Sequence, residues 1–290
     1  MDPALYQVPG PHTGRSLPAR PLVEIRPTRK WYDINLAELW RYRDMLLLLA
    51  RRDVTVRYKQ TLLGVCWALL QPVGPMLVFT LVFTRFVRLP AGGQPYALFV
   101  LAGLVPWSFF AAGVGSASGS LISHGNIVSK VYFPRLVLPL ASVLARLTDL
   151  LVGCGLLLGL ILAYGVPFAG RILCLPAAVA LLALLTFAVG LNFAAVNTVY
   201  RDAHQALPLI LQLWMFLTPV IYARDVVPAG WRWLILLNPV TGPIETFRAL
   251  VLGQPIPWPH LGLSALLSVV LLGTGLVLFA RMERHLADHL

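Results

Sequence analysis

Charged residues are scarce in this sequence, and their scarcity already excludes most classes of protein. Asp, Glu, Lys and Arg make up 12% of the 290 residues, against about 25% in a typical soluble domain. Beyond residue 59, six stretches of at least 21 residues contain no charged residue. Because about 20 apolar residues suffice for a helix to cross a bilayer, these stretches predict membrane spans. They exclude a soluble enzyme, a disordered chain and, despite the net charge of +11, a nucleic-acid-binding protein.

The sequence also lacks the residue patterns of metal, nucleotide and nucleophile chemistry. Its three cysteines, Cys66, Cys154 and Cys174, stand alone in or beside apolar stretches, which favours small hydrophobic residues over a disulfide or a metal site. No G-x-x-x-x-G-K-[S/T], H-E-x-x-H or G-x-S-x-G pattern occurs, and the six acids after residue 62 are widely separated. We therefore expect no catalytic residue, bound metal or cofactor in this chain.

The first 62 residues differ from the rest of the chain. Residues 1–34 are rich in proline and lack the apolar core of a signal peptide, so we expect a disordered cytosolic tail. Residues 35–62 predict an amphipathic helix in the cytosolic interface, capped by Asn35 and with Asp53 and Arg57 paired at i,i+4. Such a helix either only anchors the chain or also receives a cytosolic partner. Its expected apolar side consists of Leu36, Leu39, Trp40, Leu46, Leu47 and Ala50.

The apolar stretches predict six transmembrane helices within residues 63–290, with both termini in the cytosol. This arrangement puts 16 of the 23 basic residues on the cytosolic side and six outside, as the positive-inside rule requires. The fold class is therefore all-α integral membrane. Gly115 with Gly119, and Gly155 with Gly159, have the small-xxx-small spacing of close helix contacts. The expected spans are residues 64–86, 97–120, 136–164, 172–196, 205–223 and 259–281.

The loop between the second and third spans, residues 122–135, predicts a short amphipathic cytosolic helix that Pro134 ends. A segment this apolar rests either on the membrane surface or in a groove of another protein. Its polar positions are Asn126, Ser129, Lys130 and Arg135, and its apolar positions are Ile127, Val128, Val131, Tyr132 and Phe133.

The stretch between the last two spans, residues 226–256, contains two apolar pieces too short to cross the membrane, separated by Asn238-Pro239. On the outer side, such pieces are typical of re-entrant or interfacial helices. Glu245 and Arg248 are three residues apart and are expected to pair. Mutual neutralisation is favoured over a role at a pore mouth.

One ion pair is expected inside a span. Arg146 lies 11 residues after Arg135, about 16 Å along a helix, which places it near mid-bilayer with Asp149 at i+3. The pair either locks helices together or lines a polar translocation path. A proton relay is not expected, because arginine does not lose its proton in a protein.

Five blocks of the chain carry a specific resemblance. They lie in order within residues 35–285 and read RDVTVRYKQTLLGVCWALLQPVGPMLVF (52–79), YALFVLAGLVPWSFF (96–110), NIVSKVYFPRLVLPLASVLARLTDL (126–150), LNFAAVNTVYRDAHQALPLILQLWMFLTPVIY (191–222) and NPVTGPIETFRALVLG (238–253). Together they closely resemble the permease subunits of type-2 ABC exporters. The most similar subgroup moves lipid-linked polysaccharides, namely O-antigen of lipopolysaccharide, capsule and teichoic acid.

The resemblance implies a homodimer in the bacterial cytoplasmic (inner) membrane. Each six-helix subunit would associate with a separate ATP-binding cassette subunit, present in two copies, which binds ATP and Mg. The chain itself is then a transport permease and not an enzyme. By the same resemblance, residues 122–135 are the coupling helix that docks on the ATPase, and the interfacial helix is a second contact. Residues 226–253 would be re-entrant helices that close the outer end of the channel.

The expected cargo is a glycan on a polyprenyl diphosphate, which is too long to be enclosed and would be exported processively between protomers. Arg52, Arg57 and Lys59 at the cytosolic mouth either steer the diphosphate or contact phospholipid head groups. Sugars suit an aromatic, uncharged path, although aromatics at such spacing also serve as lipid-facing or core residues. The candidates for the channel lining are Phe79, Phe83, Trp107, Phe109, Phe110, Trp214 and Phe216.

Two other functions stay open on the sequence. One is a type-2 permease for a drug or small lipid. The other, from a different class, is an integral-membrane enzyme acting on polyprenyl-linked sugars, and the scarcity of acids counts against it.

Overall fold

The computed structural model describes residues 36–59, 66–87, 93–124, 133–167, 170–200 and 202–288. The predicted tail, residues 1–34, lies outside the described residues, and so does most of the predicted coupling helix. Every regular element in the described ranges is a helix. The long elements are α2 (Arg43–Lys59), α3 (Cys66–Val82), α4 (Tyr96–Ser123), α6 (Val137–Tyr164), α7 (Leu175–Val199), α8 (Asp202–Leu217), α10 (Thr241–Leu252) and α11 (Trp258–Asp288). The short elements are α1 (Leu36–Arg41), η2 (Phe83–Val87), η3 (Gly170–Cys174), η4 (Arg224–Val226), η5 (Ala229–Trp231) and α9 (Arg232–Leu237).

Five helices are long and apolar enough to cross a membrane. They coincide with five of the six predicted spans, so the prediction of an all-α integral membrane protein is confirmed at this level. The five are Cys66–Phe86, Tyr96–Ser123, Val137–Tyr164, Gly170–Val199 and Trp258–Met282.

The remaining predicted span, residues 205–223, corresponds to a shorter helix. α8 contains 16 residues, includes Pro208 and ends at Leu217, and a turn follows at residues 218–220. At 1.5 Å per residue it is about 24 Å long, less than the ~30 Å of the hydrocarbon layer. The helix therefore ends six residues before the predicted boundary.

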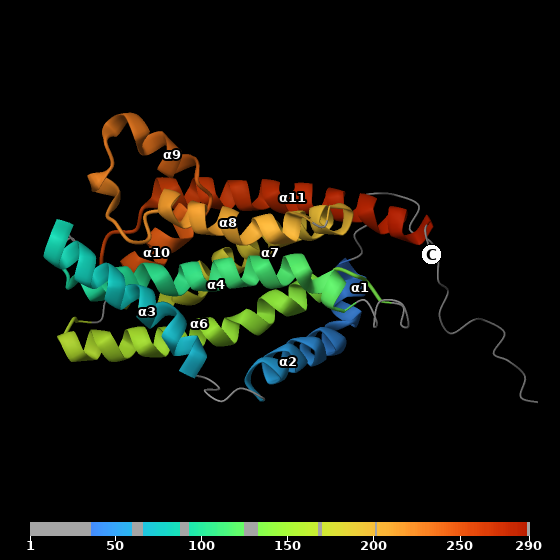
Figure 1. The fold of residues 1–290 in the computed structure, drawn as a ribbon, viewed down its shortest axis with the longest axis horizontal. Helices are drawn as coiled ribbons and strands as arrows, with labels where there is room; N and C mark the ends of the chain where they lie inside the picture. The colour runs from blue at the N-terminus through green and yellow to red at the C-terminus, as the bar shows by residue number, and fades with distance from the viewer. Residues whose placement is uncertain are drawn as a thin grey trace, which may run out of the picture. The chain divides into compact units, whose positions relative to one another are not determined.

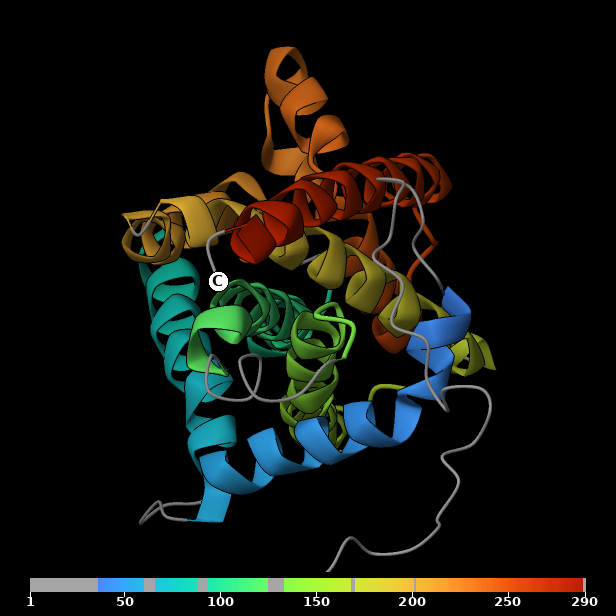
Figure 2. The same ribbon diagram turned by 90° about the vertical axis from the view of Figure 1, so that its right-hand side faces the viewer.

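α4 is the central helix of the bundle. Figure 2, which looks along the long helices, shows it between α3, α6, α7 and α8. In the most apolar 18-residue stretch of α4, 78% of the residues are buried, against 17% in the corresponding stretch of α3. The close approach to α7 occurs at glycines, because a Cβ on Gly113 would lie 2.4 Å from Thr186 and one on Gly190 would lie 2.6 Å from Ala117. Close contact was predicted at other glycines. A Cβ on Gly115, Gly155 or Gly159 would meet nothing within 4 Å, and one on Gly119 would make only an ordinary contact.

The two ends of the bundle carry different elements. α1, α2 and the C-terminal end of α11 lie at one end, which we call the α2 end, and α9 and α10 lie at the other, the α10 end (Figure 1). α2 runs obliquely across the bundle and packs on α6. It buries Leu49 and Ala50 against Phe133 and the first turns of α6. The predicted apolar side is therefore only partly correct, because Trp40 and Leu47 are exposed.

Candidate functional site

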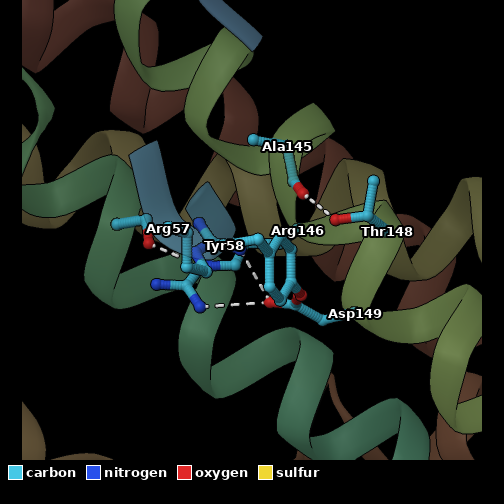
Figure 3. A network of polar contacts seen from close by, with 7 residues as sticks. Arg57, Tyr58, Ala145, Arg146, Thr148 and Asp149 are labelled. Atoms are coloured by element: carbon cyan, nitrogen blue, oxygen red, sulfur yellow. Dashed lines mark hydrogen bonds and ion pairs between the residues drawn. The ribbon is translucent and has the colours of Figure 1, made fainter. Parts of the chain in front are cut away.

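Asp149 of α6 is the centre of a polar cluster that joins two helices distant in sequence. Its Oδ2 accepts hydrogen bonds from Arg57 Nη1 of α2 at 2.8 Å and from Arg146 Nη1 at 3.1 Å (Figure 3). The Tyr58 hydroxyl, also from α2, donates to Oδ1. The predicted Arg146–Asp149 contact is thus present, but it is part of a larger cluster.

This cluster carries more positive than negative charge. Two guanidinium groups share one carboxylate, and the side chains of Arg57, Arg146 and Asp149 are only 26%, 21% and 14% exposed. Arg146 Nε also donates to Ser116 Oγ of α4 at 2.8 Å. Within the described ranges, Asp149 is the only acid within 4.0 Å of either arginine. One positive charge is therefore left without a neutralising group at a site with little access to water.

A second contact fastens α2 to α4. Asp53 Oδ1 lies 3.4 Å from Nε2 of His124, which is 7% exposed. The other ring nitrogen, Nδ1, lies 2.9 Å from the carbonyl oxygen of Ser120, which can only accept, so Nδ1 carries a proton. The Asp53 carboxylate beside Nε2 raises the pKa of His124 above its usual value, and the opposing effect of burial is smaller. The predicted Asp53–Arg57 pair does not form, because the two side chains bind α4 and α6 instead.

A cavity of about 340 Å³ lies between α2, α4 and α6, next to the Asp149 cluster. Among the residues predicted for the cytosolic mouth, Arg52 and Arg57 line it, whereas Lys59 is an exposed residue at the end of α2. A smaller cavity of about 20 Å³, lined by Gln71, Ser108 and Asp149 among others, lies on the α3 side. The lining of the larger cavity is Arg52, Asp53, Val56, Arg57, Ser116, Ser123, His124 and Ser142.

The loop between α4 and α6 is held to α2 at both of its ends. Residues 126–132 of the predicted coupling helix lie outside the described residues, so docking of Asn126, Ile127, Val128, Ser129, Lys130, Val131 and Tyr132 stays a prediction. At the start of the loop His124 contacts Asp53. At its end Phe133 is 5% exposed and packs in the cluster that contains Leu49 and Ala50. Phe133 therefore faces α2, while Arg135 is half-buried.

At the α10 end, the predicted Glu245–Arg248 pair is not formed. Arg248 is 4% exposed, and its Nη2 donates to the carbonyls of Pro219 at 3.0 Å and Val220 at 2.6 Å. Its guanidinium also lies 4.0 Å from the centre of the Phe99 ring. Glu245 Oε2 instead lies 3.7 Å from Arg224 Nη1. The carbonyls after α8 are better partners for Arg248 because they would otherwise be unsatisfied inside the protein.

The predicted channel-lining aromatics separate into two groups. Trp107, Phe109 and Phe110 of α4 are 5% exposed or less and belong to the main core, which does not agree with a channel lining. The reason is the central position of α4, which is apolar on all sides. Phe79, Phe83 and Trp214 are half-buried, and Phe216 is 48% exposed. Trp214 also donates Nε1–H to Asn238 Oδ1 at 3.0 Å.

In the part of the chain that the structure describes, no three His, Cys, Asp or Glu side chains are grouped as metal ligands would be. The three cysteines are free thiols. The contacts that sequence reasoning missed are those of Arg57, Tyr58 and Asp53 with α6 and α4. The only signal for these contacts in the sequence was the charged side of the predicted amphipathic helix.

Known proteins are similar to this chain along most of its length. Residues 45–252 match the model of the ABC-2 type transporter family. The chain is 32% identical over 257 residues to the O-antigen export system permease protein RfbA of Myxococcus xanthus, covering 87% of this chain and 97% of that protein. It is 26% identical over 246 residues to RfbA of Klebsiella pneumoniae, covering 84% and 94%. It is 24% identical over 238 residues to the polysialic acid transport protein KpsM of Escherichia coli, covering 80% and 91%. Since the family match spans more than half of the chain, this multi-pass membrane protein belongs to the ABC-2 type transporter family.

Proposed function

We propose that this chain is the membrane-spanning permease subunit of an ATP-driven exporter of lipid-linked polysaccharide. The family membership supports a transport role, and the relatives' names specify export of O-antigen and transport of polysialic acid. ATP and Mg would be bound by a separate ATP-binding subunit, present in two copies on a homodimer of this chain. The permease then contributes the path and no catalytic residue.

The proposed topology has six crossings, with α8 as the fifth. α8 connects the α2 end, where α7 finishes, to the α10 end, where α9 and α10 lie (Figure 1). A short helix still crosses if the bilayer thins locally or its flanking turn enters the membrane. The α2 end would face the cytosol, because 16 of 23 basic residues then lie inside. α9 and α10 would be the outer re-entrant pair.

Helix length supports a position of the Asp149 cluster near the membrane surface rather than at mid-bilayer. α4 and α6 each contain 28 residues, about 42 Å, and so exceed the ~30 Å hydrocarbon layer by roughly 12 Å. Asp149 follows Val137, the first residue of α6, by 12 residues, about 18 Å. If the excess length protrudes into the cytosol, the carboxylate lies about 6 Å inside the hydrocarbon boundary. Arg57 and Tyr58 of an interfacial helix reach it there.

The attachment of α2 suggests how an ATPase would act on the spans. A partner that moves the loop between α4 and α6 also moves α2, because His124 and Phe133 hold the two loop ends to it. α2 in turn is hydrogen-bonded to Asp149 of α6 through Arg57 and Tyr58. The remaining candidates for the channel lining are Phe79 near the end of α3, Phe83 in η2, and Trp214 and Phe216 on α8. The exposed faces of α3 and α8 would meet lipid or the second protomer.

The single observation that carries this proposal is the family match over residues 45–252 together with polysaccharide-exporting relatives. The test is deletion of the chain in its own cell, followed by analysis of surface and cytosolic glycans. Accumulation of a lipid-linked polymer in the cytosol, reversed by a plasmid copy, is the expected result. An unchanged surface glycan would overturn the proposal. In that case loss of tolerance to a drug would favour the small-substrate permease instead.

A further inference from the structure

We propose that the cavity between α2, α4 and α6 binds the phosphate head group of a membrane lipid. The head group belongs either to the polyprenyl diphosphate that carries the glycan or to an anionic phospholipid. The first case rests on the proposed function and deepens it, since it identifies where the cargo is first held.

The charge of the surrounding residues favours an anion. Arg52 and Arg57 line the cavity, and Arg146 lies behind Arg57 on the same carboxylate. Against these three positive groups stand two carboxylates, Asp53 and Asp149, so the site keeps an excess of +1 even with His124 neutral. The guanidinium groups of Arg57 and Arg146 are partly buried, and such groups are stabilised by a full complement of acceptors. A bound phosphate would supply the missing negative charge.

The hydrogen-bond donors at the cavity also suit phosphate oxygens. Guanidinium groups bind phosphate through two parallel N–H groups. Ser116 and Ser142 add hydroxyl groups from α4 and α6. The Ser116 oxygen accepts from Arg146, so its own proton is available for another acceptor. The Ser123 hydroxyl, by contrast, already donates to the carbonyl of Gly119 at 2.9 Å.

The depth of the cavity indicates a lipid as the source of the phosphate. Ser123 and His124 end α4, and Ser142 follows the start of α6 by five residues, about 8 Å. The head-group layer of a bilayer is about 5–8 Å thick on each side. If the excess length of α4 and α6 protrudes from the hydrocarbon layer at this end, the cavity lies at the level of lipid head groups, with α2 as one of its walls. Its 340 Å³ is at the small end of ligand sites, which run from about 300 to 1,000 Å³, and fits a head group but not a long glycan.

The test uses the full chain, purified with its ATP-binding partner in phosphatidylcholine nanodiscs, and farnesyl diphosphate as the probe. Farnesol is the uncharged control ligand. Arg52→Gln removes a cavity arginine, and Arg51→Gln makes the same change one residue away on α2, outside the cavity lining. We expect Arg52→Gln to weaken binding of farnesyl diphosphate about tenfold, the effect of one charged hydrogen bond. Arg51→Gln should stay within about twofold, and Arg52→Lys should recover part of the loss.

Equal affinities of Arg52→Gln and Arg51→Gln, or equally tight binding of farnesol, would overturn the site. Nanodiscs containing phosphatidylglycerol distinguish the two sources of phosphate. Competition by phosphatidylglycerol against farnesyl diphosphate assigns the site to phospholipid, and its absence assigns it to the prenyl diphosphate. The proposed function fails separately, by normal glycan export in the deletion strain, and that result would leave the binding difference between the two arginine variants intact.

Discussion

Replacing Asp149 by asparagine tests whether its carboxylate holds the interfacial helix to the transmembrane bundle. The substitution keeps the shape but removes the one negative charge that Arg57 and Arg146 share. Leaving a buried charge without its partner costs about 3–5 kcal/mol. The three side chains are 14–26% exposed and the amide oxygen still accepts one hydrogen bond, so the lower end, about 3 kcal/mol, is expected.

The assay for Asp149→Asn is reversible unfolding in mixed detergent micelles, with the free energy of unfolding as the measured quantity. The matched control is Asp225→Asn, which removes a carboxylate that is 86% exposed and 3.8 Å from Arg224. That change should cost under about 0.5 kcal/mol. A double variant with Arg57→Gln should lose less than the sum of the two single variants, because they remove the same contact. Equal stability of the two asparagine variants would refute the reasoning.

Three further perturbations follow from the structure. Asp53 raises the pKa of His124, so their pairing stabilises the fold fully below about pH 6.5 and is lost as the pH rises through the raised value; unfolding measured across pH 5–9 should show this decline in the natural chain and not in His124→Gln. Arg248→Met leaves two carbonyls after α8 unsatisfied and should lower the free energy of unfolding by about 3 kcal/mol; a loss under about 0.5 kcal/mol would contradict the capping role. Gly190→Ala places a Cβ 2.6 Å from α4 and should cost about 1–3 kcal/mol, whereas Gly155→Ala meets open space and should be neutral or stabilising. Equal melting temperatures of these two alanine variants would rule out the close helix contact.

Local features of the site were predictable from the sequence, and distant ones were not. Arg146 and Asp149 are three residues apart on one helix, so their contact needs only helical geometry. The bond from Arg57 to Asp149 joins positions 92 residues apart and depends on where α2 packs. Local spacing also misleads when better partners exist. Arg248 stands at i+3 from Glu245, yet it binds the carbonyls of the turn after α8.

The aromatic candidates illustrate a second limit. α4 is apolar on every side, so its sequence has no periodicity that separates a lipid face, a core face and a channel face. Trp107, Phe109 and Phe110 were expected at a channel and lie in the core, because α4 is the helix that the others surround. A glycine pattern also does not indicate which helix packs against it. The α4–α7 contact uses Gly113 and Gly190 rather than the predicted pairs Gly115/Gly119 and Gly155/Gly159.

The sequence alone determined that this is a helical membrane protein of a transporter family, since hydrophobicity over about 20 residues and family motifs are properties of the chain read in order. It also determined that one arginine and one aspartate meet within a span. Only the tertiary structure decided that α2 is fastened to α4 and α6, that the cluster around Asp149 has one positive charge too many, and that a cavity lies beside it. Those features arise from side chains brought together across 90 or so residues, and no local pattern encodes which face of one helix meets which face of another.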